Sequence, residues 1–176
     1  MWKNICALLL AFVLFACEEQ ADLSNSQAYA KDGVSFTMPG NWKVTDDTAE
    51  EGFRYISIES SGDAVVGVSV FYNSVRIELE DYVDLIIENF NAELPVGSRN
   101  RGEVFEFTPD NRENIIKAIR NQFAITLASV EVPHTSDFYE MMANSDSVVI
   151  FTQVSDEDKD LVQQGFDQLI NSLEVE

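Results

Sequence analysis

The sequence predicts an α+β protein, with an antiparallel sheet of about six strands sandwiched between helices. Short segments alternate apolar and polar residues, whereas two longer segments repeat apolar residues every three or four positions. The order of strands, helix, strands and helix is typical of α+β sandwiches. The 176 residues, of which 45% are hydrophobic, have an ordinary globular composition, and this length predicts a single domain.

The N-terminus has the anatomy of an export signal. Residues 1–4 carry one positive charge, and an apolar run too short to span a bilayer follows from Ile5 to Phe15. The run ends in Leu14-Phe15-Ala16-Cys17, which resembles the lipobox of bacterial lipoproteins, in which the cysteine is acylated and becomes the new N-terminus. Phe15 departs from that pattern, which prefers a smaller or branched residue. Leu14 is too large for an ordinary cleaved signal.

This resemblance divides the chain into a signal peptide (residues 1–16), a lipidated N-terminus with a flexible tether (17–30) and a folded domain (31–176). The tether is predicted because residues 18–30 show no apolar periodicity. Several acyl chains on Cys17 would attach the protein stably to a membrane. The absence of aspartate after the cysteine favours the bacterial outer membrane, facing the periplasm, although the acidic Glu18-Glu19 start also resembles the surface-export signals of some bacteria.

The folded part begins with predicted strands. Residues 33–39 alternate apolar and polar and stop at a proline, Gly40-Asn41 makes a turn, and Trp42 starts a new strand. Residues 53–59 and 64–72 form a predicted hairpin, and its first strand has Arg54, Ile56 and Ile58 on one face. We expect Trp42 to be buried.

A helix is predicted next, ended by Pro95 and Gly97. Its apolar stripe, with acids between, consists of Leu79, Tyr82, Val83, Ile86, Ile87 and Phe90. This stripe predicts a helix that covers one face of the sheet.

The second half of the chain begins less clearly. Residues 104–107 are strand-like, and residues 123–127 predict a strand that continues towards Val132. Between them, Ile115, Ile116 and Ile119 fit a short helix or part of a strand, and we favour the helix.

The last third is expected to be a loop, a strand and a helix. A long loop is predicted over 133–147, a buried strand over 147–154 and an amphipathic helix over 161–173, with Ser155 as its N-cap. Within the loop, Phe138, Tyr139, Met141 and Met142 suit either a cover over the sheet, which we prefer, or an adaptable contact surface.

Several of these features together resemble the PsbP-like (Mog/PsbP/DcrB) superfamily. They are the string GVSFTMPGNW over residues 33–42, a hairpin, the helix start Leu79-Glu-Asp-Tyr82, and a last strand leading into a helix that ends Asn171-Ser172-Leu173. The resemblance covers the chain from about Ala30 to its end and fits least over residues 98–135. It implies an antiparallel sheet of about six strands between helices. It also implies a binding or assembly protein rather than an enzyme, because members include an extrinsic subunit of photosystem II and bacterial lipoproteins.

The charge excludes one class of function. The chain has 31 acidic and 11 basic residues and a formal net charge of −20, so a surface that neutralises phosphates, and with it nucleic-acid binding, is excluded as the main activity.

Two acidic clusters are candidate metal sites. Asp156, Asp158 and Asp160 alternate as in a calcium loop, but the sixth position, which requires glycine, is Leu161, and the twelfth would be Asp167, within the predicted helix. Acids that complement the helix dipole explain these residues without a metal. The second cluster, Asp46, Asp47, Glu50 and Glu51, is predicted to be a solvated loop.

Catalytic and cofactor chemistry find little support. His134 has neither a second histidine nor a cysteine to complete a zinc site, since Cys6 leaves with the signal and Cys17 is acylated. No G-x-S-x-G turn indicates a nucleophile. We therefore expect no catalytic residue, no cofactor, no metal and no disulfide, with Cys17 as the single modified site.

The sequence thus predicts a lipid-anchored, non-catalytic binding or assembly protein of the bacterial cell envelope that contacts another envelope protein. The alternative is a carrier or sensor of a small ligand in a cleft between helix and sheet, and an enzyme is the weakest hypothesis. A carrier requires a pocket of about 300 Å³ or more. An enzyme requires convergent titratable groups with perturbed pKa values.

Overall fold

The structure is a computed structural model that describes residues 19–60, 62, 64–73, 75–94, 97–110, 112, 114–144 and 146–176. The predicted signal peptide, Cys17 and Pro95 lie outside these residues. Among the described residues, no helix combines the length and the hydrophobicity that crossing a bilayer requires.

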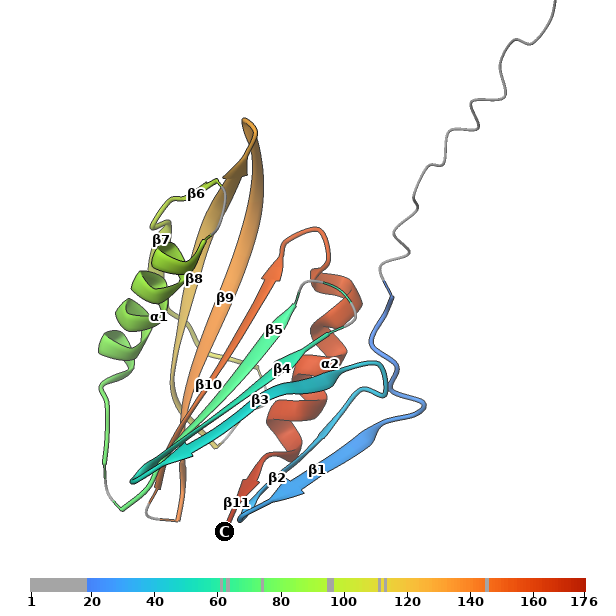
Figure 1. Cartoon of the computed structure of the whole chain (residues 1–176), viewed down its shortest axis with the longest axis vertical. Coiled ribbons are helices and arrows are strands. Elements are labelled where there is room, and N and C mark those ends of the chain that lie inside the picture. The colour runs from blue at the N-terminus through green and yellow to red at the C-terminus, as the bar shows by residue number, and fades with distance from the viewer. Residues whose placement is uncertain are drawn as a thin grey trace, which may run out of the picture.

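A large antiparallel sheet forms the body of the protein (Figure 1). Its strands, in spatial order, are β3 (Lys43–Glu50), β4 (Phe53–Glu59), β5 (Val65–Phe71), β10 (Asp146–Ser155), β9 (Val130–Ala143), β8 (Ile115–Leu127) and β6 (Ser98–Arg99), with β7 (Glu103–Glu106) also paired to β8. The described part of the sheet therefore has eight strands, more than the six expected. The additional strands come from the region between the two helices.

A second, three-stranded sheet and two helices complete the fold. The small sheet consists of β1 (Gln27–Lys31), β2 (Val34–Met38) and β11 (Glu174–Val175), and the helices are α1 (Leu79–Glu93) and α2 (Lys159–Ser172). The helices lie on opposite faces of the large sheet, and the small sheet lies on the α2 side (Figure 1). The predicted sandwich of a sheet between helices is confirmed.

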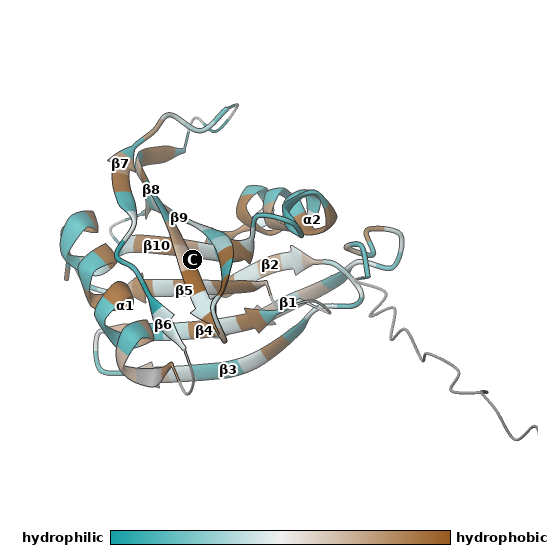
Figure 2. Ribbon diagram, turned by 90° about the horizontal axis from the view of Figure 1, so that it is seen from above, coloured by the Kyte–Doolittle hydropathy of each residue, from teal (hydrophilic) through white to brown (hydrophobic). Residues whose placement is uncertain are grey.

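Each face of the large sheet has its own hydrophobic core. On the α2 face, Ile56, Ile58, Val68 and Ile150 pack with residues of the small sheet and of α2. On the α1 face, the core comprises Phe71, Leu79, Tyr82, Val83, Ile87, Ile119, Phe138, Val149 and Phe151. Figure 2 shows hydrophobic and hydrophilic residues alternating around both helices, as expected for helices that bury one side.

Several predicted elements are confirmed. Strand β2, the β4–β5 hairpin, helix α1 and strand β10 lie within a few residues of the predicted ranges. Arg54, Ile56 and Ile58 are buried while Phe53 and Tyr55 on the other face are half-buried, as the alternation predicted.

Two predictions for the second half are wrong. Residues 115–119, expected as a helix, begin strand β8, and residues 133–143, expected as a loop, belong to strand β9. The two strands pair from Ile115 opposite Met141 to Leu127 opposite Val130. Strand β9 shows no alternation because residues 135–139 are buried on both faces, and a doubly covered strand loses the period of two.

The prediction of a flexible tether over residues 17–30 is also wrong for residues 19–30, which are the part that the structure describes. The Ala21 amide donates to the Leu161 carbonyl at 3.0 Å, the Gly40 amide donates to the Asp22 carbonyl at 2.9 Å, and residues 27–31 form β1. The Tyr29 ring stacks on Phe36, with centroids 4.7 Å apart. Backbone pairing and one aromatic contact order this segment, and neither requires an apolar repeat.

The predicted N-cap of the last helix is displaced. The N-cap residue of α2 is Asp158, and Ser155 ends β10, with its hydroxyl donating to the Asp158 carboxylate at 2.5 Å. The strand therefore extends over the residue that the sequence assigned to the helix cap.

Candidate binding sites on the two faces of the sheet

A polar cleft of about 490 Å³ lies between α2 and strands β8 and β9. It is lined by Phe107, Thr108, Pro109, Asp110, Arg112, Arg120, Asp137, Tyr139, Gln163, Asp167 and Asn171. The chain supplies these residues from β8, β9, α2 and the segment between β7 and β8.

One wall of this cleft is a paired arginine and aspartate. Arg120 on β8 and Asp137 on β9 are cross-strand partners, and Nε and Nη2 of Arg120 donate to the two carboxylate oxygens of Asp137 at 2.6 and 2.7 Å. The Tyr139 hydroxyl donates to the same carboxylate at 3.2 Å. The hydrogen bonds to Asp137 raise the pKa of Arg120, and burial raises the pKa of the Tyr139 phenol.

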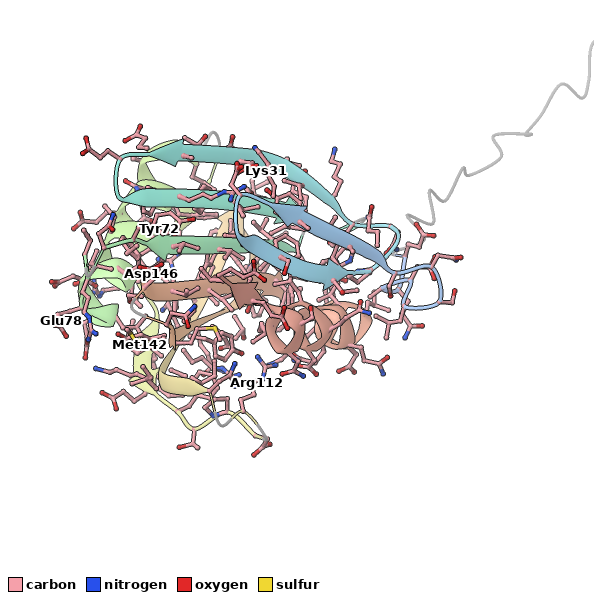
Figure 3. The ribbon with its side chains drawn as sticks, turned by 90° about the horizontal axis from the view of Figure 1, so that it is seen from below. Lys31, Tyr72, Glu78, Arg112, Met142 and Asp146 are labelled. Carbon is pink, nitrogen blue, oxygen red and sulfur yellow. The ribbon has the colours of Figure 1, made fainter. Side chains whose placement is uncertain are left out.

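The other wall is Arg112, which Figure 3 shows beside α2. Its side chain is only 7% exposed, its Nη2 pairs with the Asp167 carboxylate, and its guanidinium carbon lies 5.0 Å from the centroid of the Tyr139 ring. Gln163 Nε2 also donates to Asp167 at 3.0 Å. Arg112 Nη1 is buried and has no hydrogen-bond partner among the described residues.

Arg120 and Tyr139 are suited to donating hydrogen bonds rather than to transferring protons. The pKa values of Arg120 and Tyr139 are both raised, so at neutral pH the arginine stays charged and the phenol stays protonated. A general acid or base works best with a pKa near the working pH, which neither group has. Arginine donors beside aromatic rings suit a polar ligand that offers acceptor oxygens.

An apolar groove of about 390 Å³ lies on the opposite face, beside α1. Its lining residues are Phe53, Tyr55, Ser69, Tyr82, Leu85, Ile86, Asn89, Phe90 and Phe151. The lining comes from α1 and from the outer face of β4, β5 and β10, beside the core residues that α1 covers.

The floor of the groove is buried and closely packed, and its helical edge is exposed. The Tyr82 and Ser69 hydroxyls are buried and 2.9 Å apart, and the Tyr82 ring packs edge-on against Phe71 and Phe138. Burial raises the pKa of Tyr82 and keeps its phenol neutral. Leu85, at the edge, is 46% exposed.

The candidate metal ligands do not converge. Asp46, Asp47 and Glu50 lie in strand β3 rather than in the expected loop, and Asp47 pairs with Arg54 and Lys31. Over the described ranges, no three His, Cys, Asp or Glu residues are grouped closely enough to hold a metal ion.

The other acidic cluster and the histidine have local partners. Asp156 accepts a hydrogen bond from Thr135 at 2.7 Å, and Asp160 lies in the first turn of α2. His134 Nδ1 lies 2.9 Å from the Val132 carbonyl, and its ring stacks on Phe123.

The comparison with solved structures finds proteins similar to this chain, whereas the comparisons by sequence do not. No family model and no curated protein matches the sequence. The solution structure of cyanobacterial PsbP from Synechocystis sp. PCC 6803 matches 88% of this chain and 94% of its own, with a TM-score of 0.52 and 13% identity. The chain has the PsbP-like fold. The crystal structure of LpqN, involved in cell envelope biogenesis of Mycobacterium tuberculosis, matches 85% of this chain and 90% of its own at a TM-score of 0.42 and 7% identity.

In this PsbP-like domain the aromatic and methionine cluster of β9 is part of the core. Phe138, Tyr139 and Met141 are buried and Met142 is half-buried. We expected these residues to be buried in a loop that covers the sheet. They are buried, but they belong to a strand of the sheet itself.

Sequence reasoning missed the residues that line both clefts of the PsbP-like domain. Asp137 lies in the segment predicted as a loop, and Arg112 and Arg120 lie just outside the short helix predicted around Ile115 to Ile119. A usable signal existed, because only 11 residues of this acidic chain are basic and three of them, Arg112, Lys117 and Arg120, fall within nine positions. The convergence of Arg112 and Arg120 with α2 was not visible in the sequence.

Proposed function

We propose that the protein is a lipid-anchored, non-catalytic binding protein of the bacterial cell envelope, held to the outer membrane through Cys17 and contacting another envelope protein. The lipobox-like Leu14-Phe15-Ala16-Cys17 supports the anchor. The PsbP-like fold is compatible with binding, although a fold by itself does not define a function.

The observation that carries the binding role is the apolar groove beside α1. Leu85 is 46% exposed at its edge, and Phe53, Tyr55 and Phe90 line it while only half-buried. Contiguous exposed apolar surface on a soluble domain typically marks an interaction site. The pKa values of Tyr82, Arg120 and Tyr139 are raised, so these three groups favour binding over acid–base catalysis.

The anchor is tested by fractionating cells that express the wild-type protein or its Cys17→Ser variant. We expect the wild type in the membrane fraction with incorporated labelled fatty acid, and the variant in the soluble fraction without label, because the acyl chains supply the membrane affinity. Equal membrane partition of the two forms would contradict the proposal.

The contact is tested in the same cells by placing a photo-crosslinking amino acid at residue 85, with residue 157 as the control. Glu157 is exposed in the turn before α2. We expect a discrete crosslinked band from residue 85 that weakens in the Cys17→Ser background, since confinement to the membrane raises the effective concentration of the partner. Identical crosslinking patterns from both positions would remove the groove as the contact.

A second candidate is a carrier of a small polar ligand, favoured by the volume of the polar cleft and by the buried Arg112. A carboxylate ligand would compete with Asp167 for the guanidinium group of Arg112. With citrate as the probe, this function predicts a rise in Tm for the wild type and none for Arg112→Gln. If millimolar citrate leaves the wild-type Tm unchanged, carboxylate carriage is excluded.

A further inference from the structure

The helix edge of the apolar groove carries acids without ion-pair partners. Leu85 is flanked on the helix surface by Asp81 and Glu88, four residues before and three after it, which are the spacings of neighbours on one helix face. Both are exposed, and neither forms an ion pair with a described residue. Glu78, at the N-cap, is likewise exposed and lies at the outer edge of the molecule in Figure 3.

Two further acids of α1 are neutralised by basic residues outside the helix. Glu80 pairs with Lys117, and Asp84 pairs with Arg101 at 2.5 Å. The acids that flank Leu85 on the helix surface therefore keep their charge free for a partner, within the part of α1 whose side chains the structure describes.

The opposite edge of the groove is also acidic. Phe53 pairs with Glu50 and Ser57 pairs with Asp46 across β3 and β4, so these acids project from the same face of the sheet as the aromatic floor. Both are exposed on the edge strand. The groove is thus an apolar floor between two acidic edges.

We propose that this groove binds a basic segment of a protein partner, with apolar side chains seated on Phe53, Tyr55 and Leu85 and with Lys or Arg residues beside Asp81, Glu88 and Glu50. This inference rests on the proposed function and specifies its partner chemistry. The apolar floor supplies the burial that holds the segment, and the acidic edges select against acidic and neutral partners. A second copy of this chain, with a net charge of −20, is a poor occupant.

The test uses the full chain carrying Cys17→Ser and three fluorescent peptides read by anisotropy. One peptide is amphipathic with leucine and lysine, the second has glutamate in place of lysine, and the third has serine in place of leucine. We expect binding of the leucine–lysine peptide only, with affinity that falls as salt rises because exposed charges are screened.

Variants locate the site on the groove. Leu85→Asp and the double variant Asp81→Lys/Glu88→Lys should each weaken binding of the leucine–lysine peptide about tenfold, roughly the effect of losing one buried apolar anchor or two exposed charge pairs. The matched control is Glu157→Lys/Glu174→Lys, which makes the same charge change at exposed positions near α2 and should leave the affinity unchanged. Circular dichroism shows that each variant is folded.

Each of the following results would overturn the proposal. Equal binding of the lysine and glutamate peptides would remove the charge selection, and equal binding of the serine peptide would remove the apolar floor. Binding of a fluorescent fatty acid in preference to every peptide would make the groove an acyl-chain site. Self-association in sedimentation that Leu85→Asp abolishes would make it a dimer interface.

The experiments distinguish failure of the basic-segment proposal from failure of the proposed function. If residue 85 crosslinks to an envelope protein in cells while the lysine peptide is not preferred, the binding role stands and the basic partner chemistry is wrong. If Cys17→Ser remains in the membrane while the lysine peptide binds, the anchor is wrong and the groove stands.

Discussion

Replacing Trp42 by alanine is expected to lower the free energy of unfolding by roughly 3–5 kcal/mol, as for other large-to-small core substitutions. Trp42 is 2% exposed and meets Phe166 of α2 edge-on, with ring centroids 5.5 Å apart. Its ring joins the turn after β2 to the helix, so its loss opens a cavity between them. Urea unfolding followed by circular dichroism measures the change, and a loss below about 1 kcal/mol would contradict the packing described.

The same contact predicts a coupled effect at Gly165. A Cβ at this position of α2 would lie 2.5 Å from Cζ2 and 2.7 Å from Cη2 of Trp42. Alanine is favoured over glycine in helices by about 1 kcal/mol, yet Gly165→Ala should destabilise the wild type because the indole cannot yield easily. In the Trp42→Ala background the same change should cost markedly less, because only the close approach to Pro39 Cγ, at 2.8 Å, remains. A double-mutant cycle measures this coupling, and simple additivity would refute it.

Replacing Arg54 by methionine is expected to cost about 3 kcal/mol, because it leaves a largely buried carboxylate without its main partner. Arg54 is 1% exposed and donates through Nε to Asp47 at 2.9 Å, through Nη1 to the Lys31 carbonyl at 2.8 Å and through Nη2 to the Tyr29 hydroxyl at 2.9 Å. It thereby joins β4 of the large sheet to β1 of the small sheet. The matched control is Arg54→Met/Asp47→Leu, which removes both charges and should recover much of the loss.

The pH dependence of stability provides an independent check on this pair. Hydrogen bonds from Arg54 hold the pKa of Asp47 far below its usual range, whereas burial and Asp47 raise the pKa of Tyr29 to about 12. A carboxyl group whose pKa is lower in the folded state stabilises the fold above its unfolded pKa of about 3.9, and that contribution is lost as the pH falls further. The stability difference between the wild type and Asp47→Asn should therefore shrink below about pH 4. A difference that stays constant down to pH 2 would show that Asp47 is not ionised in the pair.

Strand β4 and helix α1, which sequence analysis located correctly, each have a more buried and a less buried side, whereas β5 and β10 are buried on both faces and were recognised as apolar runs. Strand β4 alternates between half-buried Phe53 and Tyr55 and buried Ile56 and Ile58, and α1 buries the stripe that begins with Leu79. Trp42 is buried as expected. The sheet between helices follows from these patterns, and the PsbP-like resemblance over residues 33–42 agreed with the same order of elements.

Elements that depend on partners distant in sequence were misread. Strand β9 is buried on both faces and so has no period of two, and β8 takes its extended form by pairing with it. Strand β1 is ordered by pairing with β2, although its own sequence resembles a tether. Local patterns report how one segment is buried, but they do not report which segment lies beside it.

The sequence by itself determined the α+β class, the sidedness of the helices, the acidic charge and the lipobox-like motif that predicts an anchor at Cys17. The tertiary structure alone decided the β8–β9 pairing, the convergence of Arg112 and Arg120 with α2, and the apolar groove between the acidic edges of α1 and β3. The physical reason is that periodicity is a property of neighbours along the chain, whereas a cleft is formed by residues that only folding brings together.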